Sequence, residues 1–315
     1  NHWTITPVAN AITYDAYRPD QTNHYFALDA DGHPALVYGD TTNHDGHGGA
    51  FYLACRGVAA SACDSTANWQ EATLSDQFML SAPELVFTPA GEPRFLGQYI
   101  NSEANIDKLV YGECNADCTL GTMDFLYEAG AYVDYSLQLD HSGRPRVVYY
   151  TGNAAGDLGP FQLYYLWCDT DCTRLANWSN HNLHTQSGNG WSVDLVLDKA
   201  DRPHFAYKMG DEGPGYAWCT AACESDHGSW HALLVESRQP LQEENPVEPF
   251  VECSSSSWTS GHLPALALDA QGNPRLGFDT KHQYAGVDLR PGHQGEPCAV
   301  STDIPLARFL MLDQP

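Results

Sequence analysis

Three side chains far apart in the sequence have the types needed to bind a soft metal ion. His24 stands five residues before Asp29, and Trp191 and His262 each stand seven residues before an aspartate that ends an apolar segment. Two imidazole nitrogens suit copper or zinc, and near-linear ligation by two nitrogens suits Cu(I). We therefore expect a copper or zinc site at the two histidines, with Trp191 beside them, if the fold brings the three together.

A repeat in the sequence predicts a fold that could bring these three residues together. A copy has an apolar strand, a turn of the pattern Asp-x-x-Gly-x-Pro, a second apolar strand and an aromatic strand that ends at a cysteine. Thr88 replaces the aspartate in the second copy, Asp201 replaces the glycine in the fourth, and the fifth has no clear cysteine strand. The clearest copy spans residues 136–168, and the turn prolines of the five copies are Pro34, Pro93, Pro145, Pro203 and Pro274. A repeat of four short strands is typical of propeller blades. We predict an all-β, five-bladed β-propeller with four antiparallel strands in each blade.

The repeats predict one domain over residues 1–315, with blades near 24–74, 82–128, 134–184, 192–236 and 262–298. Residues 1–8 look like a fourth strand that completes the last blade and closes the ring. Residues 239–261 look like a long loop, and 307–311 could form an extra strand. Closure would make the first and last blades neighbours, so that His24, His262 and Trp191 meet at the mouth of the channel. The alternative is that each is an ordinary loop residue.

The ten cysteines predict disulfides and an oxidising compartment. Four pairs lie close in sequence after the third strand of successive repeats: Cys55/Cys63, Cys114/Cys118, Cys168/Cys172 and Cys219/Cys223. Such spacing suits hairpin disulfides, and separate blades would hold the pairs too far apart to share a zinc ion. Elimination pairs Cys253 with Cys298. We expect a mature chain that is secreted, periplasmic or on the outer cell surface.

Charge and hydropathy exclude several classes of partner. The net charge of −25 would repel nucleic acids, and no apolar run is long enough to span a bilayer. We expect a monomer whose acidic surface gathers cations. Calcium is a further candidate ligand of the loop carboxylates, although these lack the spacing of a calcium-binding loop. They are Asp20, Asp40, Asp45, Asp157, Asp211 and Glu212.

Three arginines share one column, directly after the turn proline. They are Arg94, Arg146 and Arg275, and His204 takes this column in the fourth repeat. Such a trio could clamp an acidic sugar, but the aspartate that begins each turn lies across from it. Ion pairs within each blade are the simpler interpretation.

The repeat resembles that of bacterial extracellular propellers, including sialidase-like proteins. It is also similar to the copper-binding surface proteins of methane-oxidising bacteria, the MopE/CorA type. That resemblance covers nearly the whole chain and implies copper(I) held by two histidines and a tryptophan oxidised to kynurenine. In that family one histidine lies two positions after the tryptophan, and no Trp-x-His occurs in this sequence.

Our first functional hypothesis is therefore a secreted copper-binding protein, with His24 and His262 as paired ligands and Trp191 as a weak third ligand or an oxidised derivative. The alternatives are a carbohydrate-binding or sialidase-like propeller, whose tryptophans and tyrosines would stack on sugars, and an adhesion or scaffold module. Against the second, many aromatic residues recur at strand positions where core packing explains them: Tyr38, Tyr149, Tyr150, Tyr164, Tyr165 and Tyr207. No catalytic motif is present, and we expect a binding protein rather than an enzyme.

Overall fold

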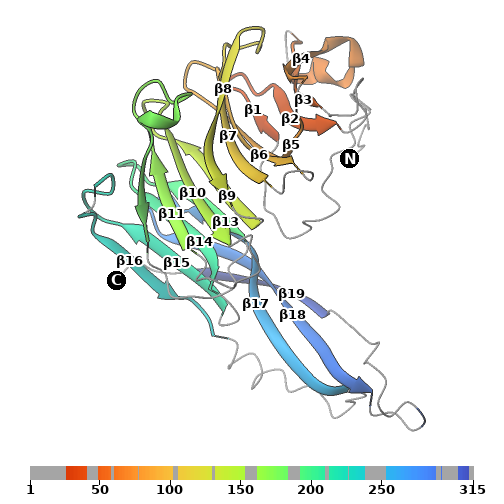
Figure 1. The fold of residues 1–315 in the computed structure, drawn as a ribbon, viewed down its shortest axis with the longest axis vertical. Helices are drawn as coiled ribbons and strands as arrows, with labels where there is room; N and C mark the ends of the chain where they lie inside the picture. The colour runs from red at the N-terminus through yellow and green to blue at the C-terminus, as the bar shows by residue number, and fades with distance from the viewer. Residues whose placement is uncertain are drawn as a thin grey trace. The chain divides into compact units, whose positions relative to one another are not determined.

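The chain folds into five antiparallel β-sheets in a computed structural model (Figure 1). The structure describes residues 26–40, 49–57, 60–76, 78–101, 106–129, 132–152, 162–183, 192–209, 213–225, 227–237, 253–288, 292 and 304–311. Two compact units make up the chain. Unit 1 holds residues 1–159 and 163–182, and unit 2 holds residues 160–162 and 183–315.

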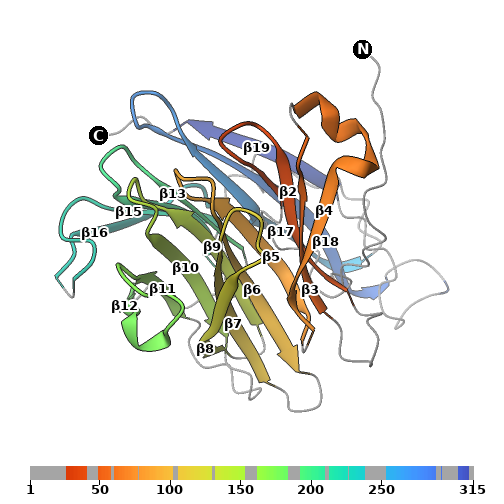
Figure 2. The same ribbon diagram turned by 90° about the horizontal axis from the view of Figure 1, so that it is seen from above.

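Unit 1 contains three four-stranded sheets, each with its strands side by side in sequence order. Sheet 1 consists of β1 (Phe26–Leu28), β2 (Pro34–Asp40), β3 (Gly49–Cys55) and β4 (Trp69–Ser75). Sheet 2 consists of β5 (Leu80–Phe87), β6 (Pro93–Asn101), β7 (Ile106–Cys114) and β8 (Gly121–Ala129), seen from above in Figure 2. Sheet 3 consists of β9 (Tyr132–Leu139), β10 (Pro145–Gly152), β11 (Gln162–Trp167) and β12 (Ser179–Asn182). Short 3-10 helices, η1 (Ala60–Asp64), η2 (Thr66–Asn68) and η3 (Leu175–Asn177), precede β4 and β12.

Unit 2 contains two sheets with the same connectivity. Sheet 4 consists of β13 (Val193–Leu197), β14 (Pro203–Met209), β15 (Gly213–Cys219) and β16 (Trp230–Leu234). Sheet 5 consists of β17 (Cys253–Leu268), β18 (Pro274–Asp288) and β19 (Ile304–Met311). In the described parts of the chain no helix is long and apolar enough to cross a membrane.

Five sheets of this kind confirm the predicted all-β fold with five blades. The predicted loop over residues 239–261 is wrong for its last nine residues, because β17 begins at Cys253 and pairs with β18 as far as Asp288. The extra strand predicted near residue 307 is confirmed, since β19 pairs with β18. The predicted closing strand, residues 1–8, lies outside the described residues.

The turn between the first two strands follows from the Gly-x-Pro pattern. In sheet 3 the N–H of Gly143 donates to the carbonyl of Asp140 at 2.8 Å, and Gly143 has a φ of 78°. Glycine adopts this left-handed conformation without steric cost. In sheet 4 the equivalent residue is Asp201, with a φ of 58°; aspartate is one of the few other residues that tolerate it.

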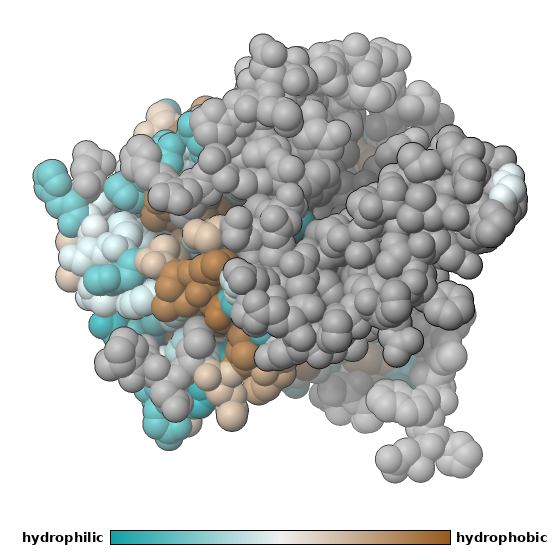
Figure 3. All heavy atoms as spheres, turned by 90° about the horizontal axis from the view of Figure 1, so that it is seen from below, coloured by the Kyte–Doolittle hydropathy of each residue, from teal (hydrophilic) through white to brown (hydrophobic). Residues whose placement is uncertain are grey.

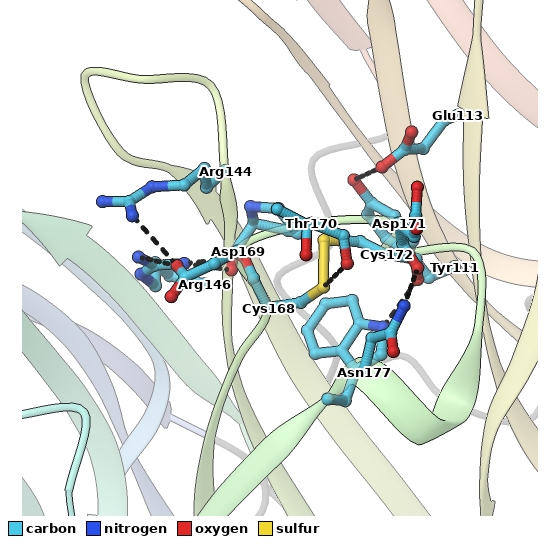
Figure 4. The surroundings of a disulfide bond; sticks show 12 residues. Tyr111, Glu113, Arg144, Arg146, Cys168, Asp169, Thr170, Asp171, Cys172 and Asn177 are labelled. Carbon is cyan, nitrogen blue, oxygen red and sulfur yellow. Dashed lines mark hydrogen bonds and ion pairs between the residues drawn. A yellow bond between two sulfur atoms is a disulfide. The ribbon is translucent and has the colours of Figure 1, made fainter.

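The four local disulfides are confirmed: Cys55–Cys63, Cys114–Cys118, Cys168–Cys172 and Cys219–Cys223. Each closes the loop that follows the third strand of its sheet. In sheet 3 the Trp178 indole N–H donates to the carbonyl of Cys172 at 2.6 Å, and the Asn177 amide donates to the carbonyl of Asp171 at 3.0 Å (Figure 4). The predicted partner of Cys253, Cys298, lies outside the described residues.

Carboxylates join the first strands of neighbouring sheets in both units. Glu84 in β5 is 1% exposed, and its Oε2 accepts a hydrogen bond from the backbone N–H of Leu137 in β9 at 2.5 Å. Asp194 in β13 accepts one from the N–H of Leu266 in β17 at 2.6 Å. In both cases the carboxylate residue lies four residues before the residue that begins the turn of its sheet. The residue that donates its N–H lies three residues before the residue that begins the turn of the next sheet. The same hydrogen bond between neighbouring sheets therefore recurs in the two units, and we call it the carboxylate clamp.

Apolar faces of neighbouring sheets form the core within each unit. Leu96 and Tyr111 of sheet 2 pack with Leu137 and Tyr149 of sheet 3. Apolar residues also reach the surface, where they lie among hydrophilic ones in the view from below (Figure 3). The large exposed ones are Phe26, Leu28, Leu120, Leu175, Leu233, Leu234, Phe309 and Met311. Scattered exposure of this kind is normal on protein surfaces.

Candidate functional site

The predicted copper ligands are not tested by the described residues. His24 and Trp191 lie outside them. His262 lies in β17, where its backbone is opposite Asp279 next to two register shifts, and its side chain is outside the described part. Among the residues that the structure describes, no three His, Cys, Asp or Glu side chains could hold a metal ion together. The copper site, like the calcium alternative, stays a prediction.

The arginine column confirms the prediction of ion pairs within each blade. Arg146 is fully buried, and its Nη2 lies 3.0 Å from Oδ2 of Asp140 and 3.1 Å from Oδ1 of Asp169 (Figure 4). Its Nη1 donates to the carbonyls of Pro145 and Cys168, both at 3.0 Å. These contacts tie the turn to the disulfide loop of the same sheet. A buried guanidinium with four acceptors is a structural group and does not clamp a ligand.

The other arginines of the column behave alike, with one variation. Arg275 pairs with Asp269. In sheet 2 the turn begins with Thr88, so that Arg94 pairs instead with Glu92 at 2.9 Å and donates to the carbonyl of Cys114 at 3.1 Å. The predicted turn and the disulfide loop therefore share one end of each sheet, which we call the stapled end.

Sheet 4 has an imidazole where sheets 2, 3 and 5 have a guanidinium. His204 is 2% exposed; its Nδ1 lies 2.6 Å from the hydroxyl of Tyr216, and its Nε2 lies 3.6 Å from Oδ2 of Asp198. Burial lowers the pKa of His204 below its ordinary value, and the negative charge of Asp198 opposes this. Arg202 also contacts Asp198, with Nε at 2.7 Å from Oδ2. His204 is therefore neutral at pH 7 and can accept a proton.

A row of stacked rings leads from His204 towards the surface. Tyr216 and Trp218 lie two residues apart in β15, so their side chains are on the same face of the sheet. Their ring centroids are 5.2 Å apart, with an angle of 19° between the planes. Trp218 lies opposite His231 of β16, at 5.1 Å and 20°. Tyr216 is buried, Trp218 is half-buried and His231 is exposed. The row ends in an aromatic surface at the stapled end of sheet 4.

The exposed end of this row contacts a hydroxyl group, and a guanidinium lies in the turn of the same sheet. The hydroxyl of Thr220, which is exposed, lies 3.3 Å from Nε2 of His231. The Arg202 side chain, on the same sheet, is 45% exposed and is held by Asp198. We call Trp218, His231, Thr220 and Arg202 the sheet 4 platform. It combines ring surface with hydrogen-bonding groups on a rigid strand end, which is how polar ligands with one apolar face are bound.

Comparisons with known proteins give distant structural similarities. No family model and no curated protein matches the sequence. An endo-arabinase from Bacteroides thetaiotaomicron aligns with a TM-score of 0.45 and 10% identity over 94% of this chain and 96% of the arabinase. An ulvan lyase aligns with 0.47 and 9% identity over 82% of this chain and 65% of the lyase. A fucose lectin from Kordia zhangzhouensis aligns with 0.31 and 14% identity over 48% of this chain and 96% of the lectin. At these values they assign neither a family nor a ligand to the chain.

The sequence predicted the core role of the repeated tyrosines but missed the platform. Tyr149, Tyr165 and Tyr207 are buried as expected, at 0%, 0% and 4% exposure. Trp218 and His231 are 13 residues apart, and only the pairing of β15 with β16 brings them together. Placing Cys219 opposite Trp230, where the third strand ends and the fourth begins, would have predicted that Trp218 faces His231.

Proposed function

We propose that this chain is a carbohydrate-binding protein that uses the sheet 4 platform. The observation that carries the proposal is the exposed imidazole of His231 stacked on the half-buried indole of Trp218 at 5.1 Å. A pyranose ring has a weakly positive C–H face and a rim of hydroxyl groups. The negative face of an aromatic ring attracts the former.

The polar part of the platform supports the same class of ligand. Thr220 can donate and accept hydrogen bonds, and Arg202 presents donors whose orientation Asp198 fixes. These groups lie at the end of paired strands, where binding costs little conformational entropy because the backbone is already ordered. A sugar that stacks on His231 would place its hydroxyl groups within reach of Thr220.

Binding to an array of neutral and acidic glycans, followed by calorimetry with the best ligand, tests this function. We expect His231→Ala to weaken binding about tenfold or more, which is about 1.4 kcal/mol. His227→Ala is the matched control, because His227 is an exposed histidine like His231 but lies in the loop before β16. An array without any signal refutes the function, and an unchanged Kd in His231→Ala refutes the site.

A further inference from the structure

We propose that Tyr216 is a redox-active tyrosine, which loses its electron through Trp218 and its phenolic proton to His204. The inference does not depend on carbohydrate binding. It rests on the hydrogen bond of 2.6 Å between Tyr216 and His204 and on the stack of Tyr216 on Trp218 at 5.2 Å. Tyr216 is 4% exposed, so bulk water does not surround its hydroxyl.

Oxidation of a buried tyrosine requires a place for its proton, because the phenol radical cation is a very strong acid. His204 supplies that place. We assign the proton of the neutral ring to Nε2, because this nitrogen faces the carboxylate of Asp198 at 3.6 Å. This tautomer leaves the lone pair of Nδ1 facing the hydroxyl of Tyr216. After transfer, the imidazolium lies beside Asp198, which compensates its charge.

The electron has a separate route. The Trp218 ring contacts Tyr216 on one side and the exposed His231 on the other, so it joins the buried phenol to the surface. A one-electron oxidant at the surface, such as a photogenerated metal–polypyridyl complex, first takes an electron from the indole. Tyr216 then donates one of its own electrons to the oxidised indole while its O–H proton moves to Nδ1 of His204. The products are a neutral tyrosyl radical, an imidazolium and the oxidant reduced by one electron; a one-electron reductant reverses the step.

Sheet 3 contains a comparison within the same molecule. Tyr165 and Trp167 occupy the positions of Tyr216 and Trp218 relative to the following cysteine, and their rings also stack, at 5.8 Å and 25°. The column of His204 is occupied there by Arg146, which stays protonated and cannot accept a proton. The stacked tyrosine and tryptophan are present in both sheets, whereas the imidazole is present in this column of sheet 4.

The experiment is flash photolysis of the full chain with a ruthenium polypyridyl oxidant, read by transient absorption and by electron paramagnetic resonance. Wild type should yield a tyrosyl radical that Tyr216→Phe abolishes and Tyr165→Phe retains. His204→Arg installs the residue of sheets 2, 3 and 5 and should slow radical formation about a hundredfold, the usual contribution of a positioned base.

Three results would overturn the proposal. They are an equal radical yield in Tyr216→Phe, loss of the radical in Tyr165→Phe, or an unchanged rate in His204→Arg. Circular dichroism and a thiol assay establish that each variant is folded with its disulfides formed. Glycan binding is measured on the same variants, so that failure of one proposal is distinguished from failure of the other.

Discussion

Replacement of Arg146 by methionine should destabilise the protein strongly, because this side chain links three parts of sheet 3. The substitution removes donors from the buried carbonyls of Pro145 and Cys168 and from the carboxylate of Asp140. Asp140 keeps Arg144, at 2.6 Å from Oδ2, so its charge stays partly compensated. The carbonyl of Cys168 loses this donor, whereas the carbonyl of Pro145 keeps the N–H of Cys168 at 3.4 Å. Loss of one member of a buried ion pair, with the hydrogen bonds lost alongside it, costs about 3–5 kcal/mol, and we expect a value in that range.

Denaturation in guanidinium with the disulfides intact measures this loss as a change in the free energy of unfolding. Arg94→Met is the matched control in the same column, because it removes the equivalent donors from the carbonyls of Pro93 and Cys114. Its ion-pair partner Glu92 has a side chain that is 44% exposed, so Arg94→Met should cost less than Arg146→Met. Arg146→His should fall between them, as sheet 4 already uses histidine there. Equal losses in Arg146→Met and Arg94→Met would refute the role that we assign to the buried pair.

Three further predictions concern acidity, the clamps and the staples. Burial lowers the pKa of His204 in the folded state, so the unfolded chain binds a proton at this residue first as the pH falls below about 6.5. The free energy of unfolding should therefore drop by at most about 1.4 kcal/mol per pH unit, and it should level off below the pKa that His204 has in the folded state. A pH series of thermal melts measures this slope, which His204→Arg should remove. Glu84→Ala leaves the buried N–H of Leu137 without its acceptor and should cost about 2–4 kcal/mol in guanidinium denaturation, whereas Glu84→Gln keeps an oxygen there and should cost less; equal costs contradict the clamp. Replacing Cys168 and Cys172 by serine opens a short loop and should lower stability by about 2 kcal/mol, and an unchanged midpoint of denaturation would show that the disulfide does not constrain the unfolded chain.

Local patterns account for what the sequence predicted well. The turn at Gly143, the staple between Cys168 and Cys172 and the pair of Arg146 with Asp140 all join residues separated by six positions or fewer in one repeat. Five copies of the same pattern made the number of sheets predictable as well. Such contacts depend on turn chemistry and strand alternation, which are legible in a single sequence.

Long-range pairing accounts for what it missed. The serine-rich run before Trp258 has the composition of a loop, but its pairing with residues 283–288 makes it a strand. The clamp from Glu84 to Leu137 joins residues 53 positions apart, and nothing in either local sequence marks it. The imidazole contact of Tyr216 likewise required the register between β14 and β15.

The direction of the carboxylate clamps has a consequence for biosynthesis. In both units the acceptor belongs to the earlier sheet and the donor to the later one. A nascent chain therefore cannot complete the hydrogen bond of Glu84 until sheet 3 has been synthesised, nor that of Asp194 until sheet 5 has been synthesised. A chain that stops after sheet 2 or sheet 4 should leave that carboxylate without the backbone N–H that it binds in the complete chain.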